Sequence, residues 1–197
     1  MQKKDISIVI GVVGFKAAGK DTFCEYLVSK YDFLMERTSD YVKEEAKKRG
    51  IKMPTTKDLQ DVGDALRRES GDGGCWMRRM IDHAAKSNAP RVLLNGIRNP
   101  VEIETLKEIL GDRLVLIGIV ATTVVRAKRF MERAPTNAPT LDYFLLMDDR
   151  DRGINQPSYG QQVDRALALV PFENVFVNNG TLDGLHEWAD TLVASSM

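Results

Sequence analysis

The sequence predicts an α/β fold of three layers, in which helices cover both faces of a parallel central sheet of about five strands. Short continuous runs of β-branched and other apolar residues occur along the chain, and such runs are typical of strands buried on both faces. Stretches with helical periodicity separate these runs, so strands and helices alternate. The connections between parallel strands are therefore expected to be right-handed crossovers.

The first half of the chain begins with a strand, a tight turn and a helix. Residues 6–13 form the first apolar run, a glycine-bearing turn follows, and residues 21–30 are amphipathic, which is the beginning of a βαβ unit. Residues 33–37 predict a short second strand. From 40 to about 87 the pattern is helical, with a break at the glycine cluster of residues 71–74.

The middle of the chain predicts two further strands with a capped helix between them. Residues 91–94 form the third strand-like run. Asn99 can cap the next helix, Pro100 suits its first position, and Glu102 stands where the carboxylate of a capping box belongs. Residues 114–120 form another continuous apolar strand.

The last third of the chain predicts two helices and then a closing strand and helix. The first helix ends before Pro135, and the second ends near Arg152. Residues 173–177 predict the last strand, and residues 181–194 predict the closing helix.

Composition favours one soluble domain over residues 1–197, and the sequence leaves open whether it is a monomer or a homodimer. The chain is 43% hydrophobic, and a chain of this length can bury a core without disulfides or a structural metal. Twenty-eight basic residues balance 28 acidic ones, which disfavours a protein that mainly coats nucleic acid or an anionic membrane but leaves a local groove possible. The N-terminal apolar run is too short to span a bilayer and has no cleavage site, so a cytoplasmic protein is expected.

A phosphate-binding loop is predicted between the first strand and the first helix. Gly14 to Lys20 fits G-x-x-x-x-G-K in the strand–turn–helix context that this motif requires, which favours it over an ordinary glycine turn. The glycines let backbone N–H groups face a phosphate, the helix adds its positive end, and Lys20 adds a cation. Asp21 then stands where the motif usually has a Ser or Thr that holds Mg²⁺, and Thr22 comes one residue later.

The segment from Gly19 to Thr22 resembles P-loop kinases of small metabolites, notably the deoxynucleoside monophosphate kinases of bacteriophages. Four later segments resemble, in the same order, the nucleoside monophosphate kinase and dephospho-coenzyme A kinase-like branch of P-loop kinases, including its archaeal-type members. These segments are residues 38–50, 59–68, 95–102 and 177–181. The resemblance covers about residues 6–190 and implies a P-loop kinase fold with ATP and Mg²⁺ as cofactors.

The resemblance implies how the cofactors are held. Asp21 would face Mg²⁺ through water, and Thr22 would contact the α-phosphate. Both residues are thereby assigned to the metal site. Asp21 is also explained as a carboxylate that the helix dipole favours, and the two explanations are compatible. The implied cofactor-binding residues are Gly14, Lys16, Ala17, Ala18, Gly19, Lys20, Asp21, Thr22, Arg129, Asn179 and Gly180.

The resemblance assigns the acceptor to a helical region at about residues 40–88. Asp40 would face the transferred phosphoryl group, either as a base for a hydroxyl acceptor or as an orienter of metal-bound water. An N-cap of the following helix explains Asp40 as well. The implied substrate-binding residues are Asp40, Lys43, Arg67 and Arg98. Lys43 stands where relatives often carry Arg, and a polar helix face explains Arg67 equally well.

A small helical lid is implied at about residues 130–155, with its tip at residues 135–139. Arg129 and Arg133 are four residues apart and share a helix face. By the resemblance Arg129 would lie over the adenine ring and Arg133 would reach the phosphates. The implied catalytic residues are Lys20, Asp40 and Arg133.

The turn after the last strand would lie at the edge of the adenine. Backbone groups of Asn179 and Gly180 would read the base there, although Thr181 as an N-cap explains the same turn. Asn95 departs from the family, because relatives often end this strand with the Walker B Asp that steadies Mg²⁺. The amide brings no charge, which leaves Asp21 and Asp40 to balance the metal.

The expected function is an ATP- and Mg²⁺-dependent phosphotransferase that moves the γ-phosphoryl group directly to a small nucleotide-like acceptor, above all a (deoxy)nucleoside monophosphate. One alternative is a kinase of another hydroxyl, on dephospho-coenzyme A or on a hydroxymethylated base in DNA. Another is a non-catalytic nucleotide-binding regulator, which Asn95 keeps open.

Overall fold

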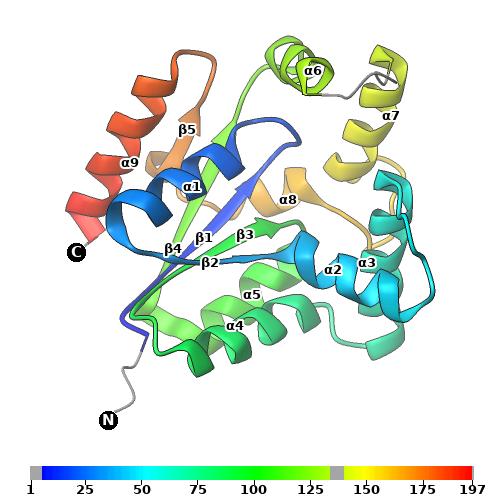
Figure 1. The fold of residues 1–197 in the computed structure, drawn as a ribbon, viewed down its shortest axis with the longest axis horizontal. Coiled ribbons are helices and arrows are strands. Elements are labelled where there is room, and N and C mark those ends of the chain that lie inside the picture. The colour runs from blue at the N-terminus through cyan, green and yellow to red at the C-terminus, as the bar shows by residue number, and fades with distance from the viewer. Residues whose placement is uncertain (1–5, 134–139, 197) are drawn as a thin grey trace.

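The computed structural model describes residues 6–133 and 140–196, which form helices on both faces of a parallel sheet (Figure 1). The sheet has five strands in the order β2-β3-β1-β4-β5. The strands are β1 (Ile8–Gly14), β2 (Leu34–Arg37), β3 (Arg91–Ile97), β4 (Leu114–Val120) and β5 (Val175–Val177). The predicted three-layer α/β class is therefore confirmed.

β1 is the central strand, and all seven of its residues are buried. It pairs with β3 on one side and with β4 on the other, which explains why its sequence is apolar without alternation. The pairing with β3 shifts register beyond Val12, which lies opposite Asn95, so that Val13 lies opposite Ile97. Gly96 is skipped, and its φ of +99° is one that a glycine adopts easily. This irregularity fixes where Asn95 lies relative to the end of β1.

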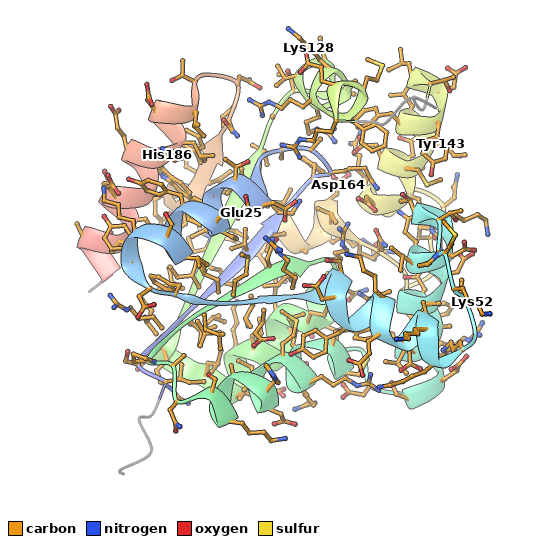
Figure 2. All side chains as sticks on the ribbon, viewed as in Figure 1. Glu25, Lys52, Lys128, Tyr143, Asp164 and His186 are labelled. Carbon is orange, nitrogen blue, oxygen red and sulfur yellow. The ribbon has the colours of Figure 1, made fainter. Side chains whose placement is uncertain are left out.

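One face of the sheet is covered by α1 (Lys20–Tyr31) and α9 (Leu182–Ser196), which lie together in Figure 1. Ile10 of β1, Phe23 of α1 and Leu185 of α9 belong to the same buried cluster. Figure 2 shows two side chains on this layer, Glu25 of α1 and His186 of α9. The first helix is thus fixed against the sheet at the point where the glycine-rich loop enters it.

The opposite face is covered by α4 (Cys75–Ser87), α5 (Pro100–Leu110) and the short α8 (Val163–Leu167). Val9 of β1 and the fully buried Trp76 of α4 belong to this second cluster. Successive residues of β1 therefore contribute to cores on opposite faces of the sheet.

Four helices lie beyond the carboxyl ends of the strands, toward the right and top of Figure 1. They are α2 (Thr38–Lys48), α3 (Thr56–Ser70), α6 (Thr123–Glu132) and α7 (Leu141–Arg152). Figure 2 shows Lys52 between α2 and α3, and Tyr143 on α7, at this outer edge. Two 3-10 turns, Gly111–Arg113 and Phe172–Asn174, precede β4 and β5.

Most predicted elements are present, with specific differences. The predicted strand at 114–120 is β4, and the helical stretch from 40 to 87 consists of α2, α3 and α4. The third strand was predicted too short, because β3 continues through Asn95 and Gly96 by pairing with β1. The last strand begins at Val175 because a 3-10 turn occupies the residues before it, and α8 was not predicted.

The capping box predicted for α5 is confirmed. The side chain of Asn99 accepts a hydrogen bond from the N–H of Val101, and Glu102 accepts one from the N–H of Asn99 at 3.1 Å. Glu102 also accepts one from the N–H of Arg98 at 2.7 Å, which fixes the backbone where the chain leaves β3. Among the residues described, no helix is both long and apolar enough to cross a bilayer.

Candidate functional site

Two cavities border the loop between β1 and α1. The first cavity has a volume of about 300 Å³ and lies at the carboxyl ends of β1, β2 and β3, where ligands bind in open α/β sheets. The second cavity has a volume of about 180 Å³ and lies between the start of α1, α6 and the turn after β5. Lys20 and Asp21 line the first cavity, whereas Gly19 and Thr22 line the second. The first turn of α1 therefore separates the two cavities.

The backbone of this loop requires the residues that the motif supplies. Gly14 has a φ of +156°, and a Cβ there would collide with the carbonyl oxygen of Ile119. Gly19 has a φ of +106°, and a Cβ there would collide with the side-chain amide of Asn178. Ala17 has a φ of +58°, although it is not a glycine. Loops of this alternating conformation turn successive N–H groups inward to form a concave site for an anion.

Lys20 lies buried beside this loop, and its Nζ donates a hydrogen bond to the carbonyl oxygen of Phe15 at 2.7 Å. The pKa of Lys20 is lowered to about 8, because burial and then the nearby Arg98 disfavour its charged form more than Asp21 and Asp151 favour it. The ammonium group is thus held in a place where it lacks solvation. A phosphate bound against it would supply the missing negative charge.

This pKa predicts that binding of a phosphate group at the loop, for example that of a nucleotide, takes up a proton above pH 8. In the free protein Lys20 loses its proton as the pH rises through about 8, and a bound phosphate would raise its pKa again. Affinity should therefore fall between pH 8 and the ordinary Lys pKa of 10.5, by at most about tenfold per pH unit. Calorimetry at pH 8.5 in buffers with different ionisation enthalpies measures the uptake directly. Equal heats in all buffers would contradict the prediction.

Asp21 and Asn95 form a pair at the base of the first cavity. The Nδ2 of Asn95, at the end of β3, donates to the Oδ1 of Asp21 at 2.7 Å. Both residues line the cavity, and no residue in the described part of the chain bonds the other carboxylate oxygen of Asp21. A single carboxylate fits Mg²⁺ that arrives with a nucleotide, because this ion is usually held by one or two carboxylates together with phosphate oxygens and water. The described residues include no cluster of three or more His, Cys, Asp or Glu residues that could hold a metal alone.

Arg98 reaches the first cavity as predicted, and it is engaged by a carboxylate that the sequence did not reveal. Its Nη1 donates to Asp151 of α7 at 2.9 Å and to Gln161 at 3.4 Å. Asp151 is 1% exposed, and its second oxygen accepts from the Nε2 of Gln60 at 2.7 Å. Burial works against the charged form of Asp151, but Arg98 and Lys16 outweigh it and hold the pKa of the carboxyl below its ordinary value.

Lys16 and Arg67 are the other predicted residues with long side chains at this cavity. Arg67 is only 4% exposed, and it forms ion pairs with Glu102 at 2.7 Å and with Asp64 at 3.2 Å. A polar helix face therefore does not describe Arg67. Its charge is balanced inside the protein, so it contributes little free charge to a substrate phosphate.

We expect Arg67→Ala to lower the free energy of unfolding by about 3–5 kcal/mol, because the fully buried Glu102 would lose its cation. Urea unfolding measures the change. The neighbouring Arg68 is a matched control, since its side chain is 59% exposed and Arg68→Ala should change stability by only about 0.5 kcal/mol. A similar small change for both variants would show that the buried pair is not stabilising.

Asp40 and Lys43 are not brought into either cavity, and this corrects the sequence-based placement of both. Each side chain is 57% exposed, and the two pair with each other at 3.4 Å. Helix α2 begins at Thr38, directly after β2, so Asp40 already lies in its first turn and faces outward, while Ser39 lines the first cavity. The N-cap alternative for Asp40 is also wrong, because Arg37 holds that position.

The second cavity brings together the two arginines that were assigned to the base and the phosphates. The Nη1 of Arg129 donates to the carbonyl oxygen of Asn178 at 3.0 Å. Thr22 lies with these arginines and not with Asp21, which places it away from the first cavity. The lining residues of the second cavity are Gly19, Thr22, Arg129, Arg133, Asn178, Thr181, Leu182 and Leu185.

The turn after β5 borders the second cavity in a different way from the one predicted. The Oδ1 of Asn179 accepts from the N–H of Thr122 at 2.9 Å, so its side chain joins two loops and does not line the cavity. Gly180 faces open space, since a Cβ there would meet no atom within 4 Å. Asn178 is the residue that fixes the loop, because its Nδ2 donates to the carbonyl oxygen of the fully buried Ala18 at 2.8 Å.

Sequence reasoning missed the roles of Gln60, Asp151 and Gln161, and it placed the turn that contains Asn178 without assigning Asn178 a contact of its own. Asp151 stands in a run of charged residues near the end of α7. Burial was the missing signal, because a carboxylate in a helical charge run is usually solvated. The predicted lid tip at residues 135–139 lies outside the described residues.

Curated relatives match most of the chain. A UPF0200 protein of Pyrobaculum aerophilum is 32% identical over 146 residues, which are 73% of this chain and 76% of that protein. A UPF0200 protein of Halobacterium salinarum is 28% identical over 193 residues, which are 95% of this chain and 93% of that protein. No family model matches the chain.

Solved structures share the fold over nearly the whole chain. A Chloroflexus aurantiacus protein, provisionally named a kinase, gives a TM-score of 0.59 at 14% identity and covers 100% of both chains. A sugar kinase of Janibacter gives 0.53 at 14% identity with 95% of each chain covered. A Thermus thermophilus protein gives 0.57 at 16% identity, with 97% of this chain and 98% of that one covered. The fold is thus one that proteins named as kinases share.

Proposed function

The chain belongs to the UPF0200 family, and we propose that it is an ATP- and Mg²⁺-dependent phosphotransferase acting on a nucleotide-like small molecule, in particular a (deoxy)nucleoside monophosphate. The observation that supports the proposal most is the pair of cavities on either side of the first turn of α1. A donor nucleotide and an acceptor would meet at the phosphate-binding loop, one from each cavity. The likeness to solved structures named as kinases supports the same class of reaction.

The second cavity suits the base and inner phosphates of ATP. Arg129 offers a planar cation on which a base can stack, and Leu182 and Leu185 offer an apolar wall. Thr22 and Arg133 line the same space and can contact phosphate oxygens. The triphosphate would then run along the backbone N–H groups of the loop toward Lys20.

The first cavity suits the transferred group and the acceptor. Lys20 would stabilise the charge that spreads over the phosphoryl oxygens during transfer, and Arg98 would hold the acceptor phosphate. Asp21 would hold a Mg²⁺ ion that arrives with the nucleotide, and the ion would supply positive charge against the phosphate oxygens. Direct in-line transfer is proposed.

Asp151 is proposed in place of Asp40 as the carboxylate that acts at the acceptor. Both of its oxygens are engaged, one by Gln60 and the other by Arg98, so its role is to orient these two side chains. A phosphate acceptor is already ionised and needs no base. The arrangement therefore fits a monophosphate better than an alcohol.

The proposal is tested with γ-labelled ATP, Mg²⁺ and a panel of acceptors: ribo- and deoxyribonucleoside monophosphates, dephospho-coenzyme A and hydroxymethylated DNA. Label in a nucleoside diphosphate is the expected result. Label only in another acceptor would replace the substrate class but keep the reaction. No label in any acceptor, together with tight Mg·ATP binding, would favour the non-catalytic regulator that Asn95 leaves open.

A further inference from the structure

Gln60 on α3 is a buried polar side chain with an incomplete set of hydrogen bonds. The proposed phosphate transfer gives it no further partner. It is 4% exposed and lines the first cavity. Its Nε2 donates to the Oδ1 of Asp151 at 2.7 Å. Its Oε1 is buried, and no described residue donates a hydrogen bond to it. Leaving such a buried acceptor unpaired costs free energy that a donor on a ligand would recover.

The orientation of this amide is fixed by its partner. A carboxylate only accepts hydrogen bonds, so the donor Nε2 must face Asp151 and the acceptor Oε1 must face elsewhere. Because Arg98 also holds Asp151, the amide is anchored through two ion-paired residues that line the same cavity. The cavity thus presents a pre-oriented hydrogen-bond acceptor.

The rest of the lining indicates what would donate to it. Val42, Leu59 and Gly63 give part of the cavity an apolar surface, as the flat body of a ring would require. Lys16, Lys20 and Arg98 give another part positive charge, which suits an anionic group. A ligand with a flat apolar body, an N–H donor and a phosphate satisfies all three features.

We propose that the Oε1 of Gln60 accepts a hydrogen bond from an N–H group on the base of the acceptor nucleotide. Gln60 is then a specificity-determining residue, and Asp151 is the positioning residue that orients it. This inference rests on the proposed function and adds the recognition of the acceptor base to it. The site would recognise the base through an N–H donor on its edge. An analogue that lacks this donor would leave the buried Oε1 unpaired and would therefore bind more weakly.

The experiment compares ligands and variants by calorimetry, without turnover. The wild-type protein is titrated with AMP, CMP, GMP, UMP and ribose 5-phosphate. The best monophosphate is then compared with its analogue lacking one base N–H, such as purine riboside monophosphate for AMP or N3-methyl-UMP for UMP. We expect a tenfold to 100-fold loss of affinity for the analogue. This arm needs no change to the protein, so it does not depend on the folding of a variant.

The second arm uses Gln60→Met, which removes the acceptor atom but keeps the length of the side chain. This variant should bind the parent monophosphate and its analogue equally, with its fold checked by urea unfolding. Gln161→Met is the matched control, because Gln161 lines the same cavity but its Oε1 already accepts from Arg98. That control should keep the preference for the base with the N–H group.

Two results would overturn the inference. One is that Gln60→Met keeps the full preference for the parent over the analogue. The other is that no monophosphate binds the wild-type protein more tightly than ribose 5-phosphate. Failure of the proposed function is seen separately, as absence of Mg·ATP binding or of transfer from labelled ATP.

Discussion

Lys20→Ala is expected to weaken Mg·ATP binding by at least about 100-fold and to reduce any turnover further, since the transferring phosphoryl group would lose a charge held in a water-poor site. Calorimetry measures the binding, and labelled ATP measures the transfer. Lys128 on α6 is a suitable control. Its side chain is 76% exposed and points outward in Figure 2, so Lys128→Ala should leave binding unchanged.

Loss of the fold would not explain a loss of binding in Lys20→Ala. The folded protein lowers the pKa of Lys20 to about 8, so below that pH the buried charge opposes folding. Removing it should leave the protein at least as stable at pH 7, apart from the hydrogen bond to Phe15. A variant that is stable and still binds Mg·ATP normally would contradict the whole proposal for the loop.

The loop was predictable because its chemistry is local. Gly14, Gly19 and Lys20 lie within seven consecutive residues between a strand and a helix, and the backbone angles of the two glycines follow from that arrangement. The order of strands and helices was predictable for a similar reason, since each element carries its own hydrophobic pattern. Sequence alone was sufficient wherever the relevant residues are neighbours in the chain.

The acceptor side was predicted less well because its contacts join distant segments. Asp151 orients Gln60, which is 91 residues away in the chain, and Glu102 holds Arg67, which is 35 residues away. No local sequence pattern predicts such partners. The direction in which the side chain of Asp40 points depends on the residue at which α2 begins, which is Thr38. A shift of one or two positions at a helix start rotates a side chain by 100° or more about the axis, as follows from 3.6 residues per turn.

Exchanging Asp21 and Asn95 is expected to preserve metal-dependent nucleotide binding, whereas removing the carboxylate alone is not. The phosphate-binding motif usually has a Ser or Thr directly after its lysine, and the P-loop kinases that the sequence resembles are expected to carry a carboxylate at the position of Asn95. This chain has the carboxylate at the first position and an amide at the second, and the two side chains are in contact at 2.7 Å. Asp21 and Asn95 together therefore carry one negative charge at the base of the first cavity.

Three variants test this reasoning. Asp21→Asn leaves two amides and should weaken Mg-dependent ATP binding by about tenfold to 100-fold, the loss typical when a residue that holds the metal through its outer shell is removed. Asn95→Asp places two carboxylates side by side, which raises the pKa of one of them and makes binding depend on pH. The double variant Asp21→Asn/Asn95→Asp restores a single charge and should recover most of the affinity. Calorimetry with and without Mg²⁺, and Mn²⁺ binding followed by electron paramagnetic resonance, measure the effect without turnover.

The double variant also bears on whether Asn95 marks a lost catalyst. If one carboxylate at either position supports the metal, the amide at position 95 is half of an exchanged pair, and wild-type turnover follows naturally. A double variant that binds as weakly as Asp21→Asn would mean that the position of the charge matters and that the pair is not interchangeable. Activity that appears only after Asn95→Asp would then identify the native protein as a nucleotide-binding regulator, because the carboxylate of Asp21 would not be serving the metal.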